Sequence, residues 1–231
     1  MTQIKVVHPN DAGWEMAPGP GGNGSKTGQL EAYTSPDGRF TTGLWWREPD
    51  EWVFERAYDE VAFITGGEAD IEFEDGSVFT LGAGDVMVTP FGTKGTWRVR
   101  ERVTKLYAIY EGPGQLTGAP AARLGAAADK SWVVLPTEPE DPNAPGEEWY
   151  AFRSGDEQFS TGVWKRVPET GPVDKDADEV SILIRGDVAI DIAGGAVVTA
   201  GPGDVLVTAK GCRGTWRAQS FVEKFWAVYH G

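Results

Sequence analysis

The sequence predicts an all-β protein made of two similar barrels, and an internal repeat together with frequent turn residues supports this prediction. Shifting the chain by 119 positions aligns 40–112 with 159–231 without a gap, and 30 of the 73 aligned positions are identical. The 31 glycines and 15 prolines interrupt helices and favour short strands joined by turns. A repeat of roughly 110 residues is an ordinary domain size.

Short runs rich in β-branched and aromatic residues mark the strands of the first repeat. Gly-Gly, Asp-Gly, Gly-x-Gly-Asp and Phe-Gly turns separate them at spacings of about 8–10 residues, which is typical of an antiparallel sandwich or barrel. The second repeat has the same pattern. The runs of the first repeat are 61–64, 70–73, 77–80, 86–89, 96–100 and 103–110.

The segments outside these runs predict the domain limits. Val6-Val7-x-Pro9 is similar to Val133-Val134-x-Pro136, so we expect an N-terminal barrel over 1–117, a linker over 118–130 and a C-terminal barrel over 131–231. Residues 119–128 are the one helix candidate, but Gly125 favours a loop with a single helical turn. Residues 15–29 and 138–147 are expected to be mobile, either as lids or as plain surface loops.

Composition excludes several classes of function. With 35 acidic and 21 basic side chains the formal charge is −14, which disfavours binding to nucleic acid or to anionic membranes. Gly19-x-Gly21-x-x-Gly24 matches a dinucleotide fingerprint in form, but it lacks the strand before it and the helix after it that phosphate binding needs. One cysteine cannot form an internal disulfide. No apolar run of 18 residues occurs, so we expect a soluble, cytoplasmic protein.

Two spaced motifs recur in both repeats. The first is Phe54-x-Arg56-x3-Glu60-x6-Gly67, repeated as Val173-x-Lys175-x3-Glu179-x6-Gly186. The second is Gly84-x5-Pro90-x-Gly92-x2-Gly95, repeated as Gly203-x5-Ala209-x-Gly211-x2-Gly214. These spacings resemble the two motifs of cupins, in the branch related to ureidoglycine aminohydrolase and ethanolamine-utilisation cupins. The resemblance implies a bicupin with two tandem jelly-roll (double-stranded β-helix) barrels and a pocket at the barrel mouth.

The sequence departs from that family at the metal ligands. A typical cupin binds a divalent metal through three histidines and one glutamate, and here only the glutamates remain, as Glu60 and Glu179. The histidine positions hold Phe54, Arg56, Gly95, Val173, Lys175 and Gly214. A lone carboxylate is an inadequate site for a transition metal, so we predict no metal centre and no cofactor.

A cation is expected where the metal would lie. Strand alternation would bring Arg56 and Glu60 into one barrel, and likewise Lys175 and Glu179. One interpretation is a buried ion pair that neutralises an inherited carboxylate. The other is a catalytic pair, in which Glu60 is a general acid or base and Arg56 binds the anionic part of a substrate.

Large aromatic residues recur at equivalent places. Trp97 and Trp216 should point inward, and Trp45 and Tyr107 recur as Trp164 and Trp226. They form either core packing or an aromatic wall around a ligand, so Trp97, Phe54, Tyr107, Trp45 and Lys105 are candidate substrate-binding residues. Lys105 and Arg98, which recur as Lys224 and Arg217, either line the pocket or pair with Asp59 and Asp178 at the rim.

The resulting expectation is a metal-independent bicupin that binds a small organic molecule in its N-terminal barrel, where aromatic residues are more numerous. One hypothesis is an enzyme that catalyses a proton-transfer step of lyase, isomerase or cyclase type through Glu60 and Arg56. In that case Glu179, Lys175 and Trp216 are the second-barrel equivalents. The alternatives are a non-catalytic binding or sensing module and a structural protein with filled barrels. The expected partner is a small molecule, and a homodimer stays open as the assembly.

Overall fold

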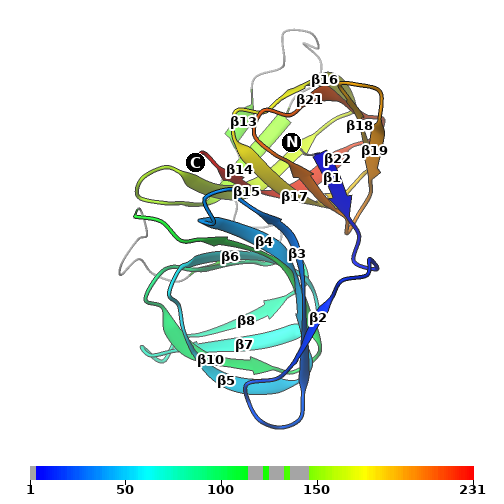
Figure 1. Ribbon diagram of the computed structural model, residues 1–231. Coiled ribbons are helices and arrows are strands. Elements are labelled where there is room, and N and C mark those ends of the chain that lie inside the picture. The colour runs from blue at the N-terminus through cyan, green and yellow to red at the C-terminus, as the bar shows by residue number, and fades with distance from the viewer. Residues whose placement is uncertain (1–3, 114–121, 125–132, 136–145) are drawn as a thin grey trace. The chain divides into compact units, whose positions relative to one another are not determined.

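The computed structural model describes residues 4–113, 122–124, 133–135 and 146–231 (Figure 1). These residues contain strands and no helix, which confirms the predicted all-β class. They divide into two compact units. The unit of Ala12–Lys130 with Ser154–Glu157 is called the first barrel here, and the unit of Met1–Asp11, Ser131–Arg153 and Gln158–Gly231 the second barrel.

The first barrel contains a seven-stranded and a four-stranded sheet. The strand orders are β12-β9-β6-β11-β4-β3-β2 and β5-β10-β7-β8, and every pairing is antiparallel. The strands are β2 (Glu15–Pro18), β3 (Lys26–Thr34), β4 (Phe40–Arg47), β5 (Asp50–Glu55), β6 (Asp59–Gly66), β7 (Glu68–Phe73), β8 (Val78–Gly82), β9 (Val86–Thr89), β10 (Lys94–Val99), β11 (Val103–Tyr110) and β12 (Ala122–Leu124).

The second barrel repeats this plan. Its sheets have the orders β1-β20-β17-β22-β15-β14-β13 and β16-β21-β18-β19. The strands are β1 (Ile4–Val7), β13 (Val133–Leu135), β14 (Gly146–Arg153), β15 (Phe159–Arg166), β16 (Glu169–Asp174), β17 (Asp178–Arg185), β18 (Val188–Ile192), β19 (Val197–Ala200), β20 (Val205–Thr208), β21 (Arg213–Ala218) and β22 (Val222–Tyr229).

The core of each barrel lies between its two sheets. Strand β6 is buried from Asp59 to Ile64 because it lies inside the larger sheet of the first barrel, with β9 on one side and β11 on the other. Ile71 and Leu81 of the smaller sheet pack with Ile64 in one apolar cluster, and Leu183, Ile190 and Leu206 belong to the corresponding cluster of the second barrel. Opposed apolar faces of two sheets are what an antiparallel barrel requires.

Three segments differ from the sequence-based expectation. Within 15–29, strands β2 and β3 form an antiparallel pair, in place of the expected mobile loop. Within 119–128, the described residues 122–124 form a strand that pairs with β9, in place of the expected helical turn. Its backbone thereby finds hydrogen-bond partners at a sheet edge. The acidic segment 138–147 lies outside the described residues except for 146–147, which begin β14.

The first strand of the chain belongs to the second barrel, which corrects the expected limit of 1–117 for the N-terminal domain. Strand β1 pairs with β20 from Ile4↔Thr208 to Val7↔Val205. The strand at the same edge of the first barrel is β12, whereas the counterpart of β13 is β2. The similarity of Val6-Val7 to Val133-Val134 therefore does not reflect equivalent positions in the two barrels. Any sheet edge with free backbone groups accepts a β-rich segment that can reach it.

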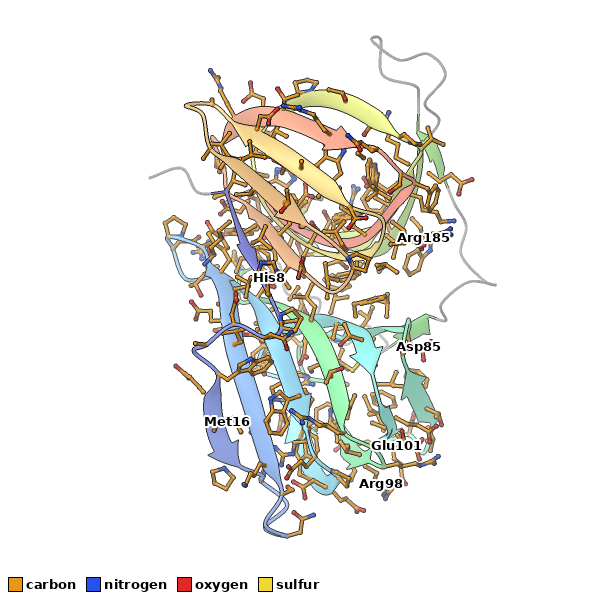
Figure 2. All side chains as sticks on the ribbon, turned by 90° about the vertical axis from the view of Figure 1, so that its right-hand side faces the viewer. His8, Met16, Asp85, Arg98, Glu101 and Arg185 are labelled. Atoms are coloured by element: carbon orange, nitrogen blue, oxygen red, sulfur yellow. The ribbon has the colours of Figure 1, made fainter. Side chains whose placement is uncertain are left out.

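A hydrogen bond of His8 links the end of β1 to the turn before β20. His8 directly follows β1 and is labelled in Figure 2. Its Nδ1 lies 2.6 Å from Oδ1 of Asp204, and the other oxygen of Asp204 accepts a hydrogen bond of 2.9 Å from the Gly201 amide. Asp85 accepts the equivalent bond from Gly82 at 2.8 Å in the first barrel. Both aspartates thus hold their own turns, as the Gly-x-Gly-Asp pattern predicts.

The His8–Asp204 pair predicts a small pH dependence of stability. The hydrogen bond with Asp204 raises the pKa of His8, so the pair stabilises the fold fully below the ordinary histidine value of about 6.5 and is lost as pH rises through the higher folded-state pKa. Because His8 is half exposed, we expect the second barrel to lose less than about 1 kcal/mol between pH 6 and 8. Urea denaturation of wild type and H8A at both pH values tests this, and an unchanged pH dependence in H8A would contradict it.

Candidate functional site

In the first barrel, the carboxylate of Glu60 on β6 lies between two cations. Oε2 is 2.8 Å from Nη2 of Arg56, and Oε1 pairs with Nζ of Lys105, which reaches it from the neighbouring strand β11. Arg56 also donates from Nε to the Thr89 hydroxyl at 3.1 Å. The carboxylate is 3% exposed. The sequence-predicted pair of Arg56 and Glu60 is thus brought together, with Lys105 as its third member.

Glu60 is held in its ionised form. Burial opposes ionisation, but the attraction of Arg56 and Lys105 outweighs burial and lowers the pKa of Glu60. A carboxylate with a lowered pKa and both oxygens engaged has little tendency to take or give a proton. This arrangement does not favour the expected acid–base role of Glu60, and it matches the alternative interpretation of a neutralising ion pair.

Aromatic side chains occupy most of the space beside Glu60. Trp52 stacks on Trp97 at a centroid distance of 5.6 Å, and Trp45 packs against both rings. Tyr107 accepts a hydrogen bond of 2.8 Å from Nε2 of Gln29. The cavity that remains is about 250 Å³. Trp45, Trp97, Lys105 and Tyr107 line it as predicted, but Phe54 does not: its ring lies in the core and under the Arg56 guanidinium.

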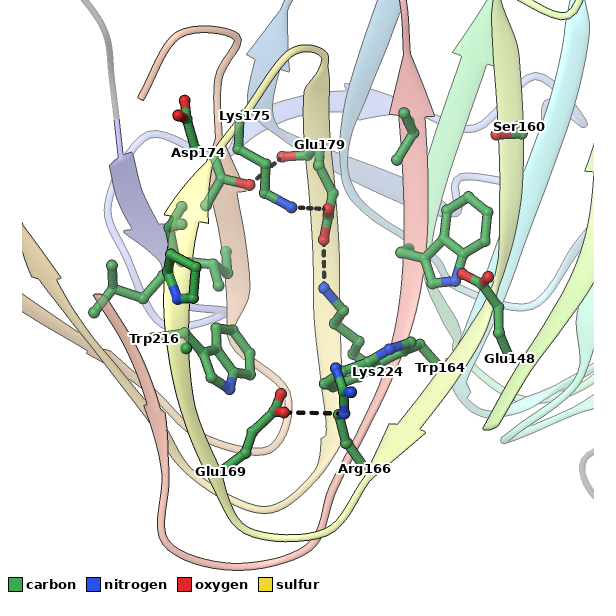
Figure 3. A pocket seen from close by; sticks show the side chains of 18 of the residues that line it. Glu148, Ser160, Trp164, Arg166, Glu169, Asp174, Lys175, Glu179, Trp216 and Lys224 are labelled. Carbon is green, nitrogen blue, oxygen red and sulfur yellow. Dashed lines mark hydrogen bonds and ion pairs between the residues drawn. The ribbon is translucent and has the colours of Figure 1, made fainter. Parts of the chain in front are cut away.

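The second barrel encloses a cavity of about 420 Å³ around Glu179 (Figure 3). Nζ of Lys175 lies 2.5 Å from Oε2 of Glu179, and Nζ of Lys224 pairs with Oε1. Burial opposes ionisation of Glu179, but both ammonium groups attract the carboxylate and hold its pKa well below the ordinary range. The predicted residues Glu179, Lys175 and Trp216 therefore share one cavity, as the repeat indicates.

Two indole rings and a second ion pair form the rest of the wall. Trp164 and Trp216 meet edge to face at 6.0 Å, and Nζ of Lys224 lies 5.1 Å and 5.5 Å from their ring centroids. Arg166 pairs with Glu169 at 2.9 Å, so these two charges cancel. Cation–π contact of this kind fixes the direction of an ammonium group.

The cavity beside Glu179 in the second barrel is larger than the cavity beside Glu60 in the first, whereas sequence reasoning placed the ligand site in the first. One position explains the difference in size. Trp52 faces Trp97 across β5 and β10, and the equivalent residue facing Trp216 is Gly171. A Cβ added to Gly171 would meet no atom within 4 Å. More aromatic residues in the first barrel thus mean a fuller interior and a smaller site.

Of the basic residues that recur in both repeats, the lysines lie inside the barrels and the arginines lie on the outer side of the small sheets. Lys105 and Lys224 lie inside their barrels and pair with Glu60 and Glu179, not with Asp59 and Asp178 as the alternative expectation had it. Asp59 and Asp178 accept hydrogen bonds of 2.8 Å from the backbone amides of Phe91 and Lys210. Arg98 and Arg217 instead pair with acidic residues of their own small sheets, Glu72 and Asp191.

Sequence reasoning missed Glu148, which also lines the second cavity. It lies on β14, directly beside Trp164 in register. Its counterpart in the first barrel is Gln29, which lies beside Trp45. Gln29 and Glu148 are 119 positions apart, the same offset as in the repeat, but both precede the aligned segments. Extending the alignment towards the N-terminus would have shown a carboxylate in place of an amide.

Comparison with known proteins agrees with this architecture. The model of the EutQ-like cupin domain family matches the chain twice, at 34–107 and 153–226, which together make up more than half of it. The chain belongs to the EutQ-like cupin family. No curated protein matches this EutQ-like cupin.

Solved structures share the fold of this EutQ-like cupin at low sequence identity. A protein of unknown function from Pseudomonas syringae pv. tomato has a TM-score of 0.77 at 19% identity, covering 99% of this chain and 100% of that one. Ylba from E. coli has a TM-score of 0.70 at 13% identity, covering 99% and 91%. HEPD from Streptomyces albus, solved with 2-hydroxyethylphosphonate and Fe(II), has a TM-score of 0.68 at 10% identity, covering 99% and 76%.

The donor set of this EutQ-like cupin does not fit the iron or other divalent metal that cupins typically bind. In each barrel both oxygens of the inherited glutamate already pair with cations. Within the described ranges, no three His, Cys, Asp or Glu side chains come close enough to hold an ion. A metal would have to displace Lys175 and Lys224 and would then find one carboxylate in place of several ligands. The same part of the chain contains no helix long and apolar enough to cross a membrane.

Proposed function

We propose that this protein binds a small organic anion in the second barrel without a metal ion. One observation carries the proposal: two ammonium groups lie on one buried carboxylate, so the triad of Glu179, Lys175 and Lys224 taken by itself has one positive charge in excess at its end of the cavity. A ligand carboxylate that bridges the two lysines would balance that charge. Buried charge without a counter-charge is costly, so the site favours an anion over a neutral molecule.

The aromatic walls of the second cavity indicate the shape and polarity of the rest of the ligand. Trp164 and Trp216 offer an apolar surface next to Lys224, which suits a flat ring or unsaturated chain attached to the anionic group. The cavity of about 420 Å³ has room for a molecule the size of a single substituted ring. Benzoate carries both features and is the probe used below.

Calorimetric titration with benzoate tests the proposal on two variants: one removes a positive charge from the cavity, and the other fills the cavity. K175M removes an ammonium group that is 29% exposed, and we expect it to weaken benzoate binding at least about tenfold, the order of one charge-assisted hydrogen bond. G171W places in the second cavity the ring that Trp52 provides in the first, and we expect it to abolish binding.

The control is K210M, which removes one lysine charge from an exposed position outside the cavity lining. It should leave the affinity for benzoate unchanged. Benzamide, the neutral counterpart of benzoate, should bind wild type more weakly than benzoate does. Wild type that does not bind benzoate, or K175M and G171W that bind it as wild type does, would refute the proposal.

A further inference from the structure

The carboxyl group of Glu148 lines the second cavity, and among the described residues it forms no direct ion pair. It is half-buried on β14, and the Tyr150 hydroxyl donates a hydrogen bond to it. Register places Glu148 beside Trp164 and Trp164 beside Lys224 on the next strand. Paired residues share a face of the sheet, so Glu148 faces the cavity about 10 Å from Lys224 measured between Cα atoms across two strand spacings. Figure 3 shows it on the side of the cavity away from Lys175.

The first barrel satisfies the equivalent pair internally, and the second barrel does not. In the first barrel Gln29 donates a hydrogen bond to Tyr107, so each of these side chains has a partner within the protein. The equivalent residues of the second barrel are Glu148 and Trp226. Trp226 is 5% exposed, lines the cavity, and its indole Nε1 has no hydrogen-bond partner among the described residues.

Trp216 provides a second unused donor in the same cavity. Its Nε1 is also buried without a hydrogen-bond partner in the described part of the chain. Buried N–H groups are normally paired. The ammonium groups of Lys175 and Lys224 are 29% and 11% exposed, so they can donate to a ligand in the cavity. Donors already in position would stabilise negative charge that develops on a ligand carbonyl oxygen.

The environment of Glu148 suits proton transfer better than that of Glu179. Burial raises the pKa of Glu148, the Tyr150 hydrogen bond and Lys224 oppose the shift, and nearby Glu179 adds to it. Arg153 of the same strand also lowers it. A carboxylate with a raised pKa takes a proton more readily than one held ionised by two cations.

We propose that Glu148 transfers protons on a 2-oxo carboxylate bound at Glu179, Lys175 and Lys224, an inference that rests on the proposed function. The ionised Glu148 carboxylate takes a proton from the carbon next to the ligand carbonyl. The C–H electron pair forms the enolate C=C bond, and the carbonyl electrons move to the oxygen, which the ammonium groups of Lys175 and Lys224 stabilise. The proton then returns from Glu148 to the enolate oxygen or to carbon, so no oxidant, reductant or other reactant is consumed.

Hydrogen exchange of phenylpyruvate in D₂O tests this inference. Phenylpyruvate carries the carboxylate, the carbonyl, a flat ring and an acidic C–H, and proton NMR follows the loss of its C3 hydrogens. We expect wild type to exchange these hydrogens faster than buffer alone. E148Q should lose at least about 100-fold of the catalysed rate, the usual scale of a general base, and E148D should recover part of it.

Two controls separate this inference from the proposed function. E147Q removes the neighbouring carboxylate, which pairs with Lys165 at 3.2 Å, and should exchange at the wild-type rate. E148Q should bind benzoate as tightly as wild type or more tightly. Exchange no faster than buffer with wild type, or E148Q exchanging at the wild-type rate, would overturn the role of Glu148 while benzoate binding stands. Failure of wild type to bind benzoate would overturn the proposed function and this inference with it.

Discussion

Replacing Glu60 with glutamine is expected to lower the free energy of unfolding of the first barrel by about 3–5 kcal/mol, the cost of leaving buried charges without their partner. The carboxylate is 3% exposed, and Arg56 and Lys105 on either side of it are 11% and 7% exposed. Glutamine fills the same volume, so the loss comes from charge and not from packing. Chemical denaturation at neutral pH measures it.

The matched variant in the second barrel is E179Q, and its effect should be smaller. Lys175 is 29% exposed and Glu179 is 12% exposed, so water compensates part of the lost attraction. The double variant E60Q/K105M should be more stable than E60Q, because it removes one of the two unpaired cations. An E60Q protein as stable as wild type would show that the triad contributes no stability.

Replacing Gly67 with alanine is expected to cost about 3 kcal/mol or more, because a side chain there is both strained and obstructed. Gly67 joins β6 to β7 with φ +78°, and its added Cβ would lie 2.1 Å from the carbonyl oxygen of Arg102. Gly186, its counterpart, has φ +82° and an added Cβ 2.2 Å from the carbonyl oxygen of Phe221. Urea denaturation of G67A measures the cost.

G38A is the control, because Gly38 has nearly the same backbone angle without the obstruction. Its φ is +75°, and an added Cβ would meet nothing within 4 Å. We expect it to lose only about 1 kcal/mol, the conformational cost of a non-glycine residue at positive φ. Equal losses in G67A and G38A would show that the contact with Arg102 is relieved at no cost.

The duplicated motifs predicted much of the interior correctly. Arg56 with Glu60 and Lys175 with Glu179 are both found as pairs inside their barrels, because the motif spacing places each cation in the short connection just before the strand that carries the glutamate. Sequence reasoning could not tell that Lys105 and Lys224 complete the two triads. That contact joins residues 45 positions apart, and it depends on β11 and β22 pairing with β6 and β17.

The relative size of the two cavities could not be read from composition. Aromatic residues in the first repeat predict either core packing or a ligand wall, and in the structure Trp52 stacks on Trp97 and fills the volume that Gly171 leaves open in the second barrel. A ring that lines a pocket and a ring that fills it look alike in a sequence. Only the packing of the opposite strand distinguishes them, since cavity volume is what remains after all neighbours are placed.

The amino-acid order alone establishes the duplication, the all-β class, the cupin-like turns and the loss of the histidines, because these follow from local spacing and from residue identity. The tertiary structure decides three further points: β1 completes the second barrel, the cavity around Glu179 is larger than the one beside Glu60, and Glu148 lines the cavity around Glu179. Each of these depends on which distant strands pair and on how much space their side chains leave. Those outcomes arise from the folded chain as a whole, and no single segment encodes them.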